Sequence, residues 1–296
     1  IGKWHLMGDY ARRKGDPKLH GFDEVICSET KYIAGGDYFH PYFFMPGLAP
    51  LNEGEYLTDR LNQEAAGFIT RNKDNPFFLY LAHYSPHTRL AGKPGLVEKY
   101  AKKPGAGKTR NNPELAAMLE SIDDGVGLIM RTVEQLGIAD HTAIIFVSDN
   151  GGEDRVTSNA PLRAGKSTLY EGGIRVPMII RAPGFGRAGT TDSRPLTTTD
   201  LHMMCVQMAG QGRAPRLSDE RPIFWHYPLE KPHFLGGRSA GAVRQGRWKL
   251  IEFYDTGESE LYDLRADIGE TRNLVKDRPA EAAKLKSMLT SWRRQL

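Results

Sequence analysis

The sequence feature that most constrains the fold is the alternation of short apolar runs with a long amphipathic helix. Residues 77–82 (Phe-Phe-Leu-Tyr-Leu-Ala) and 142–148 (Thr-Ala-Ile-Ile-Phe-Val-Ser) are continuous apolar runs. Between them, residues 114–136 carry apolar side chains at three- and four-residue steps, and Gly137 stands where a C-terminal cap belongs. Buried strands joined by a helix are typical of a parallel sheet that is covered on both faces. We therefore predict an α/β fold.

Further patterns extend this arrangement along the middle of the chain. Helical spacing and one more apolar run predict helices at 55–70 and 200–209 and a strand at 176–181. From about residue 212 the composition becomes more polar, which marks a boundary. We predict a larger domain over residues 1–215.

The tail after this boundary has the pattern of an antiparallel sheet. Short alternating runs predict strands at 241–244, 248–253 and 260–262. Pro279 then opens a helix whose apolar face carries Leu285, Leu289 and Trp292. We expect a smaller α+β subdomain, an antiparallel sheet plus a helix, over residues 216–296.

The composition excludes several classes of protein. Among 296 residues, 40 Lys and Arg stand against 36 Asp and Glu, and the net charge of +4 without a basic cluster gives no sign of a nucleic-acid partner. No apolar run reaches the ~18 residues of a membrane-spanning helix. The two cysteines, Cys27 and Cys205, form neither a disulfide framework nor a zinc-ligand set. No signal peptide precedes the initial Ile-Gly-Lys, so we expect either processing there or further sequence upstream.

Polar residues stand next to the apolar runs, where ligands bind in open α/β sheets. His87 follows the first run, Asp149 and Asn150 follow the second, and Lys166 precedes the third. Adjacent carboxylate and amide oxygens are hard ligands suited to Ca²⁺ or Mg²⁺. Each feature also has an ordinary structural interpretation, because Asp-Asn-Gly-Gly forms turns and a lone histidine or lysine is commonly packed or solvated. The single features leave both interpretations open.

Taken together and in order, these segments resemble the type I sulfatases, formylglycine-dependent enzymes of the alkaline-phosphatase-like superfamily. The matching motifs span nearly the whole chain: residues 2–6 (Gly-Lys-Trp-His-Leu, with Met7 inserted before Gly8), 20–23 (His-Gly-Phe-Asp), 86–87 (Pro-His), 147–152 (Val-Ser-Asp-Asn-Gly-Gly), 165–166 with 171–177 (Gly-Lys and Glu-Gly-Gly-Ile-Arg-Val-Pro), 244–251 (Arg-Gln-Gly-Arg-Trp-Lys-Leu-Ile) and 260–264 (Glu-Leu-Tyr-Asp-Leu). The resemblance implies a mixed, largely parallel sheet flanked by helices and a hydrolase of sulfate esters.

The resemblance also implies a role for each charged residue of these motifs. Asp149 and Asn150 would be two ligands of a Ca²⁺ ion, with Mg²⁺ the less favoured metal. Lys3 and Lys166 would hold the sulfate oxygens and stabilise the charge that develops as the S–O bond breaks.

Two histidines and three pocket residues complete the implied site. His87 would face the leaving oxygen as a general acid or bind sulfate, and His5 would hydrogen-bond the nucleophile and help it expel sulfate. The substrate would be a sulfated small molecule or glycan, and Arg163, His226 and Tyr227 are candidates for lining its pocket. For the aromatic stretch around His226, packing between the two domains is an equally good interpretation.

The nucleophile that the resemblance implies is not among these residues. Family members carry a cysteine, converted to formylglycine, in a Cys-x-Pro/Ala/Ser-x-Arg motif, and a paired Asp-Asp that completes the metal site. Neither Cys27 (Cys-Ser-Glu-Thr-Lys) nor Cys205 (Cys-Val-Gln-Met-Ala) fits that motif. We therefore expect an N-terminally truncated member rather than an inactive relative. We also expect these 296 residues alone to hydrolyse no sulfate ester and to bind Ca²⁺ weakly.

Three functions are compatible with these residues. The first is a sulfuric ester hydrolase acting on a sulfated carbohydrate or aryl sulfate, exported to the periplasm, the extracellular space or a lysosome as family members mostly are. The second is a phosphatase or phosphodiesterase of the same superfamily, against which the two lysines at the sulfate position argue. The third is a non-catalytic glycan-binding relative.

Overall fold

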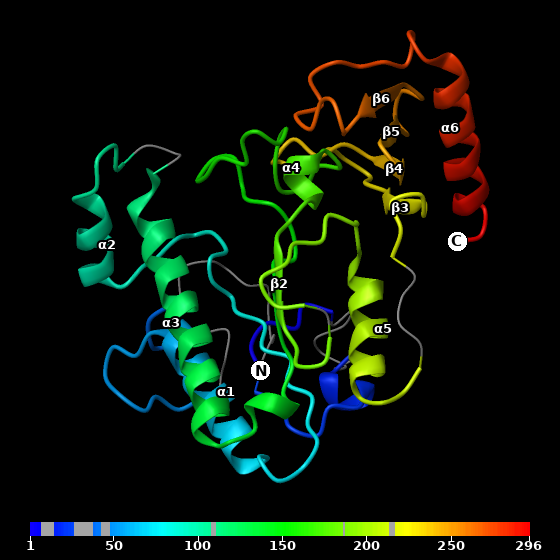
Figure 1. Ribbon diagram of the computed structural model, residues 1–296. Helices are drawn as coiled ribbons and strands as arrows, with labels where there is room; N and C mark the ends of the chain where they lie inside the picture. Colours follow the sequence, from blue (N-terminus) through cyan, green and yellow to red (C-terminus); the bar gives the residue numbers. More distant parts are fainter. Residues whose placement is uncertain (7–14, 27–37, 43–47, 108–110, 186, 213–216) are drawn as a thin grey trace. The chain divides into compact units, whose positions relative to one another are not determined.

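The computed structural model describes residues 1–6, 15–26, 38–42, 48–107, 111–185, 187–212 and 217–296 (Figure 1). The chain divides into two compact units, Ile1–Thr142 and Ala143–Leu296, and each is described by itself. These units are regions of dense internal contact, so the domain division at residue 215 stays a prediction. None of the helices in the described ranges combines the length and the apolar character needed to cross a bilayer.

The first unit is mainly helical. It contains α1 (Leu57–Arg71), α2 (Pro94–Ala101) and α3 (Pro113–Gln135), with short 3₁₀ turns η1 (Pro17–His20) and η3 (Ala139–His141). The side chain of Asn112 caps α3 by accepting hydrogen bonds from two amides of its first turn, and Gly137 follows its end at φ +70°. The helices predicted at 55–70 and 114–136 are confirmed.

Helices α1 and α3 pack closely because α3 has a glycine at the crossing. A Cβ added to Gly125 would lie 2.1 Å from the side chain of Asn62 on α1, so a larger residue would force the helices apart. A core of tyrosines, leucines and a methionine forms around α1: Tyr38, Tyr42, Tyr56, Leu57, Leu61, Tyr84 and Met118.

The apolar run at 77–82 is extended but does not form the predicted buried strand. Its one described bridge is parallel and joins Ala82 to Gly2. Phe78 and Tyr80 are 62% and 46% exposed. A strand buries both sets of alternating side chains only when both of its faces are covered, and here one set faces outward.

The second unit begins with two paired strands. Strand β1 (Ile144–Val147) pairs with β2 (Met178–Arg181), so the strands predicted at 142–148 and 176–181 are present. The pairing is antiparallel, with Val147 opposite Met178, whereas the predicted sheet is mixed and largely parallel. The long connection leaves β1 and enters β2 at the same point, whereas a parallel pair needs a crossover to the other end. The parallel core sheet implied by the resemblance is not seen in the described part of the chain.

The rest of this unit is helix α5 (Thr198–Met208) and a four-stranded sheet with helix α6 (Pro279–Arg293). The sheet has the order β3 (Ile223–Tyr227), β4 (Ala240–Gln245), β5 (Trp248–Phe253) and β6 (Ser259–Asp263), with every neighbour antiparallel. The helix predicted at 200–209 and the antiparallel tail with its final helix are confirmed.

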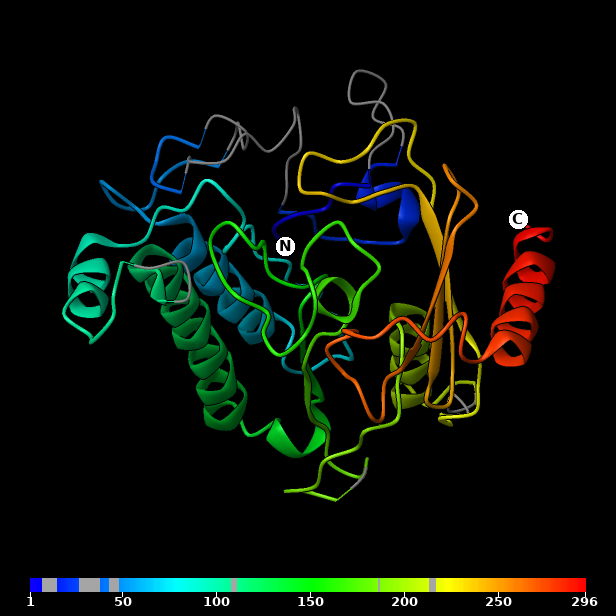
Figure 2. The same ribbon diagram turned by 90° about the horizontal axis from the view of Figure 1, so that it is seen from above.

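Side chains alternate between the two faces of this sheet. Val243, Leu250 and Leu261 pack against Leu285 and Leu289 of α6. In Figure 2 the red helix α6 lies along one side of this sheet. The opposite face carries Ala242, Ile251 and Tyr262 and packs against Leu169 and Tyr170. These last two residues belong to the segment that precedes the short helix α4 (Glu171–Ile174) and carries Lys166.

Candidate functional site

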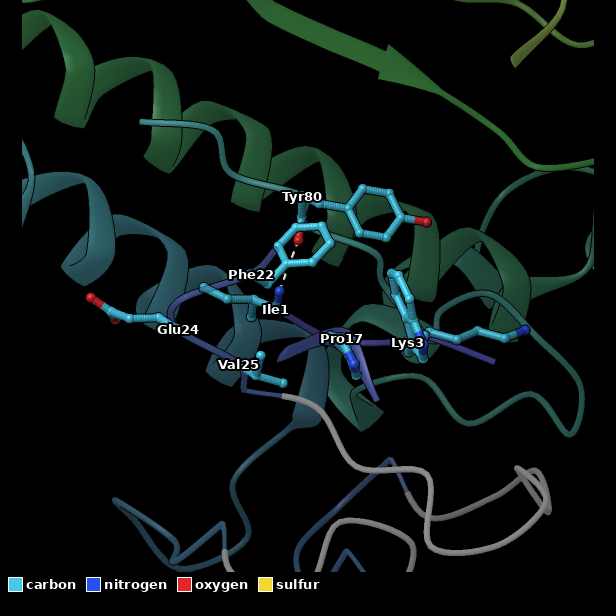
Figure 3. Close-up of a pocket in the computed structure, with 9 residues that line it drawn as sticks. Ile1, Lys3, Pro17, Phe22, Glu24, Val25 and Tyr80 are labelled. Carbon is cyan, nitrogen blue, oxygen red and sulfur yellow. Dashed lines mark hydrogen bonds between the residues drawn. The ribbon is translucent and has the colours of Figure 1, made fainter. Parts of the chain in front are cut away.

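Lys3 is fixed by its backbone to the end of the apolar run at 77–82. Its amide donates to the carbonyl oxygen of Ala82 at 2.7 Å, and the amide of Ala82 donates to the carbonyl of Ile1 at 2.9 Å. A Cβ on Gly2, which has φ +95°, would lie 2.0 Å from the Ala82 oxygen, so the glycine permits this approach. Figure 3 shows the Lys3 side chain extending away from Ile1.

The neighbouring motif residues pack beside this segment. The Trp4 indole donates to the carbonyl of Gly15 at 2.6 Å, and its ring meets the ring of Phe22 edge-on at 5.7 Å. A small pocket next to them is lined by residues of three segments, namely Ile1, Gly2, Lys3, Trp4, Pro17, Phe22, Glu24, Val25 and Tyr80 (Figure 3). The exposed His5 has φ +51°, a left-handed conformation that is uncommon outside glycine. Met7 and Gly8 of the motif lie outside the described residues.

His87 lies in a turn that two residues missed by sequence reasoning hold in place. The Tyr38 hydroxyl lies 3.0 Å from the carbonyl oxygen of Tyr84 and 2.8 Å from that of His87. Thr58 of α1 bonds to the hydroxyl of Ser85 at 2.6 Å. The turn from Tyr84 to His87 is thus anchored to the core of the first unit. A tyrosine or threonine far along the chain gives no sequence signal of such a contact.

The ring of His87 has a defined tautomer in this arrangement. Its Nδ1 lies 2.5 Å from the carbonyl oxygen of Thr88, and because a carbonyl only accepts, Nδ1 carries the hydrogen. The neutral ring would then have an unprotonated Nε2, and donation of a proton from Nε2 requires the imidazolium form.

His83, immediately before this turn, is a packed residue. Its Nε2 lies 2.7 Å from Asn62 Oδ1, and the amide nitrogen of Asn62 donates to the carbonyl of Ser121 at 3.2 Å. Burial lowers the pKa of His83 to about 4, so the ring is neutral near pH 7.

In the second unit, the Asp-Asn-Gly-Gly turn follows β1 directly. The Asp149 side chain is exposed and makes no hydrogen bond or ion pair with any residue in the described ranges. Asn150 donates from its side-chain amide to the carbonyl of Gly151 at 2.9 Å, which leaves the amide oxygen outside that bond. The Gly151 amide donates to the carbonyl of Gly173 at 2.9 Å, and a Cβ on Gly151 would lie 1.7 Å from the oxygen of Gly172. Only glycine fits this approach of two backbones.

Lys166 is tied to the same turn. Its amide donates to the carbonyl of Gly152 at 3.0 Å. Asn159, which sequence reasoning missed, clamps Gly152 by accepting from its amide and donating to its carbonyl, both at 2.9 Å. Ala164 and Ser167, on either side of Lys166, have φ +54° and +74°. Non-glycine residues held in this region persist only where the surroundings fix them, and they concentrate at functional sites.

The donors of this turn suit a divalent cation in type. A carboxylate at Asp149 and an amide oxygen at Asn150 are the hard ligands that Ca²⁺ prefers, but the ion takes six to eight of them. Within the described ranges, no group of three or more His, Cys, Asp or Glu side chains is placed to hold a metal. The two residues therefore fit part of a Ca²⁺ site.

The three candidates for substrate contact have polar partners inside the second unit or lie on β3. Arg163 donates from Nη1 to the Tyr262 hydroxyl at 2.7 Å and to the carbonyl of Glu270 at 2.9 Å. His226 Nδ1 lies 2.8 Å from the Tyr254 hydroxyl, and Tyr227 ends β3. Contact of these residues with substrate stays a prediction.

Cys205 lies on α5, and the candidate site residues fall into one group in each unit. Burial raises the pKa of the Cys205 thiol on α5, which disfavours the reactive thiolate, and Cys27 lies outside the described residues. Lys166 and the Asp149–Gly152 turn are brought together within the second unit. Lys3, His5 and His87 belong to the first unit.

Comparison with known proteins gives consistent matches. The family model "Sulfatase" matches residues 1–210, and the model "N-sulphoglucosamine sulphohydrolase, C-terminal" matches residues 164–295. A sulfatase of Formosa agariphila is 29% identical over 86% of this chain and 56% of its own length. Human N-acetylgalactosamine-6-sulfatase is 31% identical over 71% of this chain and 42% of its own length.

A solved structure agrees with these matches. The crystal structure of Ps i-CgsB in complex with k-i-k-neocarrahexaose has a TM-score of 0.81 and 28% identity, and the match covers 98% of this chain and 70% of that one. The chain spans between about two fifths and three fifths of the length of the curated relatives named here.

Proposed function

Because the chain belongs to the sulfatase family, we propose that the native protein hydrolyses a sulfate ester and releases inorganic sulfate. The observation that carries this proposal is the joining of Lys166 to the Asp149–Gly152 turn through the carbonyl of Gly152. The backbone of Lys166 is thereby joined to the turn that carries two oxygen donors suited to a cation.

The residues have separate tasks in this reaction. Lys3 and Lys166 bind the sulfate oxygens and stabilise the charge that grows as the S–O bond breaks. His87, in its imidazolium form, gives a proton from Nε2 to the leaving oxygen, and His5 hydrogen-bonds the nucleophile and takes its proton. The proton assignment for His87 follows from the bond of Nδ1 to Thr88.

A metal ion and a nucleophile, neither of which is part of the structure, would complete the chemistry. Asp149 and Asn150 would hold a Ca²⁺ ion, with Mg²⁺ less favoured, and the ion would neutralise sulfate charge. The nucleophile would be formylglycine, as in the family.

The substrate class and location are part of the proposal. Human N-acetylgalactosamine-6-sulfatase and the N-acetylgalactosamine-6-O-sulfatase of Bacteroides thetaiotaomicron are sulfatases of an amino sugar by name, and Ps i-CgsB was crystallised in complex with k-i-k-neocarrahexaose. We infer that this protein acts on a sulfated carbohydrate and is exported. Arg163, His226 and Tyr227 would contact the sugar.

The proposal is tested on the native protein with p-nitrophenyl sulfate and p-nitrophenyl phosphate. We expect sulfate release that EDTA abolishes and Ca²⁺ restores. Lys166→Met should lower kcat by about 10²–10³-fold, because a positive charge at the reacting group is lost. Lys102→Met is the matched control, since Lys102 is 73% exposed and pairs with Glu98 on the surface. Faster hydrolysis of the phosphate would favour a phosphatase, and glycan binding without turnover would favour a non-catalytic relative.

A further inference from the structure

A buried group of charges lies on the face of the β3–β6 sheet opposite α6. Lys249 Nζ lies 2.9 Å from Glu171 Oε1 and 2.9 Å from Glu270 Oε1. The three side chains are 0%, 2% and 0% exposed. A buried lysine is tolerated only with such partners, because an unpaired charge in the interior is strongly unfavourable.

The alternation of β5 places Lys249 on this face. Residues 249, 251 and 253 point the same way, and Ile251 and Phe253 belong to the core that packs against Leu169 and Tyr170. The ammonium group therefore points at the segment 163–173, which carries Lys166.

Both ends of segment 163–173 are held by the region around Glu270. At one end, Glu270 accepts a hydrogen bond from the Glu171 amide at 2.6 Å. At the other end, Arg163 donates to the Glu270 carbonyl, and its guanidinium lies 3.9 Å from the centre of the Tyr170 ring. The two ends are also joined to each other, since the Gly172 amide donates to the carbonyl of Arg163 at 2.9 Å.

The opposite side of the segment is joined to the Asp149–Gly152 turn by backbone hydrogen bonds. Gly151 donates to Gly173, and Lys166 donates to Gly152. The Asn159 amide adds a bridge, because it donates to the carbonyl of Gly152 and to that of Ala164 at 3.1 Å. A shift of the segment would move the Lys166 backbone and the turn relative to each other. Glu270 itself is held at φ +52°, as Ala164 and Ser167 are held at positive φ, and these three residues with His5 are all the non-glycine residues in the described ranges that have a positive φ.

We propose that Lys249 is a positioning residue that locks segment 163–173, and with it Lys166, against the C-terminal sheet. Its ion pairs fix Glu171 and Glu270, Glu270 fixes both ends of the segment, and the segment fixes the turn that carries Asp149 and Asn150. The C-terminal sheet is thus part of the machinery that sets the geometry of the site. The expected effect on sulfate hydrolysis rests on the proposed function, whereas the expected effect on the backbone around Lys166 does not.

The test is hydrogen exchange of the native protein and its Lys249→Met variant, measured at residue resolution. We expect the amides of Gly151 and Lys166 to exchange at least about tenfold faster in the variant, because the segment that carries both Lys166 and Gly173, the acceptor for Gly151, loses its support. The amides of α1 and α3 should keep their wild-type rates. Lys286→Met is the matched control, since Lys286 on α6 is 43% exposed and pairs with Glu252 on the same strand as Lys249.

The same variants separate positioning from a general loss of stability in kinetics. With p-nitrophenyl sulfate, Lys249→Met should lower kcat about tenfold or more with a smaller change in KM, because a displaced Lys166 fails chiefly in the transition state. Lys286→Met should keep both constants. If the wild-type protein had no sulfatase activity, the proposed function would be wrong. The hydrogen exchange of the Lys249→Met variant would still decide whether Lys249 is a positioning residue.

Two results would overturn the proposal. One is wild-type exchange of Gly151 and Lys166 in a folded Lys249→Met protein, and the other is an equal increase at every amide. If Lys249→Met does not fold, Glu270→Gln replaces it, since the glutamine keeps an oxygen for the Glu171 amide and loses the charge that pairs with Lys249. The same rise at Gly151 and Lys166 is then expected, and its absence contradicts the proposal.

Discussion

The second unit contains two sheets that differ in how completely their apolar side chains are covered. In the β3–β6 sheet, Val243, Leu250 and Leu261 are fully buried against α6. In the β1–β2 pair, Phe146 is 41% exposed and Ile179 is 66% exposed, although both strands are as apolar in sequence. The comparison teaches that an apolar run specifies a strand, whereas its partners and its burial depend on what the rest of the chain places against it.

The largest expected effect sharpens this contrast through burial. Leu285→Ala on α6 removes a side chain that is 0% exposed and should lower the free energy of unfolding by about 2–5 kcal/mol. Ile179→Ala on β2 should lower it by less than about 1 kcal/mol, because that side chain stays largely in water. Urea unfolding of both variants measures the difference. Equal losses would show that the exposed pair is packed in solution.

The turn at Asp149–Gly152 is tightly packed, although it directly follows the exposed strand β1. No atom can be added at Gly151 without a clash. Gly151→Ala should reduce turnover of p-nitrophenyl sulfate by about 10²-fold, since the backbones of residues 151 and 172 must separate and Lys166 moves with them. Gly95→Ala is the control, because nothing lies within 4 Å of a Cβ added there. Turnover by Gly151→Ala at the wild-type rate would contradict the closeness of these two segments.

The same lesson explains which parts of the molecule the sequence predicts. Helix α3 is predicted from its apolar stripe and from Gly137, and the C-terminal strands from their alternation, because these signals are local. The direction of β1 relative to β2 is not predicted. It depends on the path of residues 148–177, in which backbone contacts between glycines take part. The periodicity of apolar residues does not report on those contacts.

The candidate site divides in the same way. Its motif residues are named from sequence, but Asn159 and Tyr38 are not, and Lys249 is named only as part of the motif 244–251 without a role, because the contacts that matter are set by the fold. Lys249 did leave one signal. It lies on the same face of β5 as the buried residues Ile251 and Phe253. A charged residue at such an inward position indicates a buried ion pair.

A pH experiment extends the comparison to the first unit, where the half-exposed run 77–82 leads directly into a packed histidine. Burial lowers the pKa of His83 to about 4 from an ordinary value near 6.5. The folded state thus favours the neutral ring, and the stabilisation is complete above pH 6.5 and is lost as the pH falls toward 4. We expect a loss on the order of 2 kcal/mol across this range, measured by urea unfolding. His83→Gln cannot titrate, and an unchanged pH profile in that variant would contradict the assignment.

The smallest expected effect comes from the residue beside the one with the largest. Lys286 follows Leu285 on α6, and its ammonium lies 3.1 Å from Glu252 Oε1 with 43% of the side chain exposed. Such a pair is solvated and screened, so Lys286→Met should change the free energy of unfolding by at most about 1 kcal/mol. If α6 is held to the sheet by apolar contact, the neighbouring leucine and lysine must differ by several-fold in urea unfolding. A loss from Lys286→Met as large as that from Leu285→Ala would mean that charge pairing across the helix, rather than burial, distinguishes the covered sheet from the exposed one.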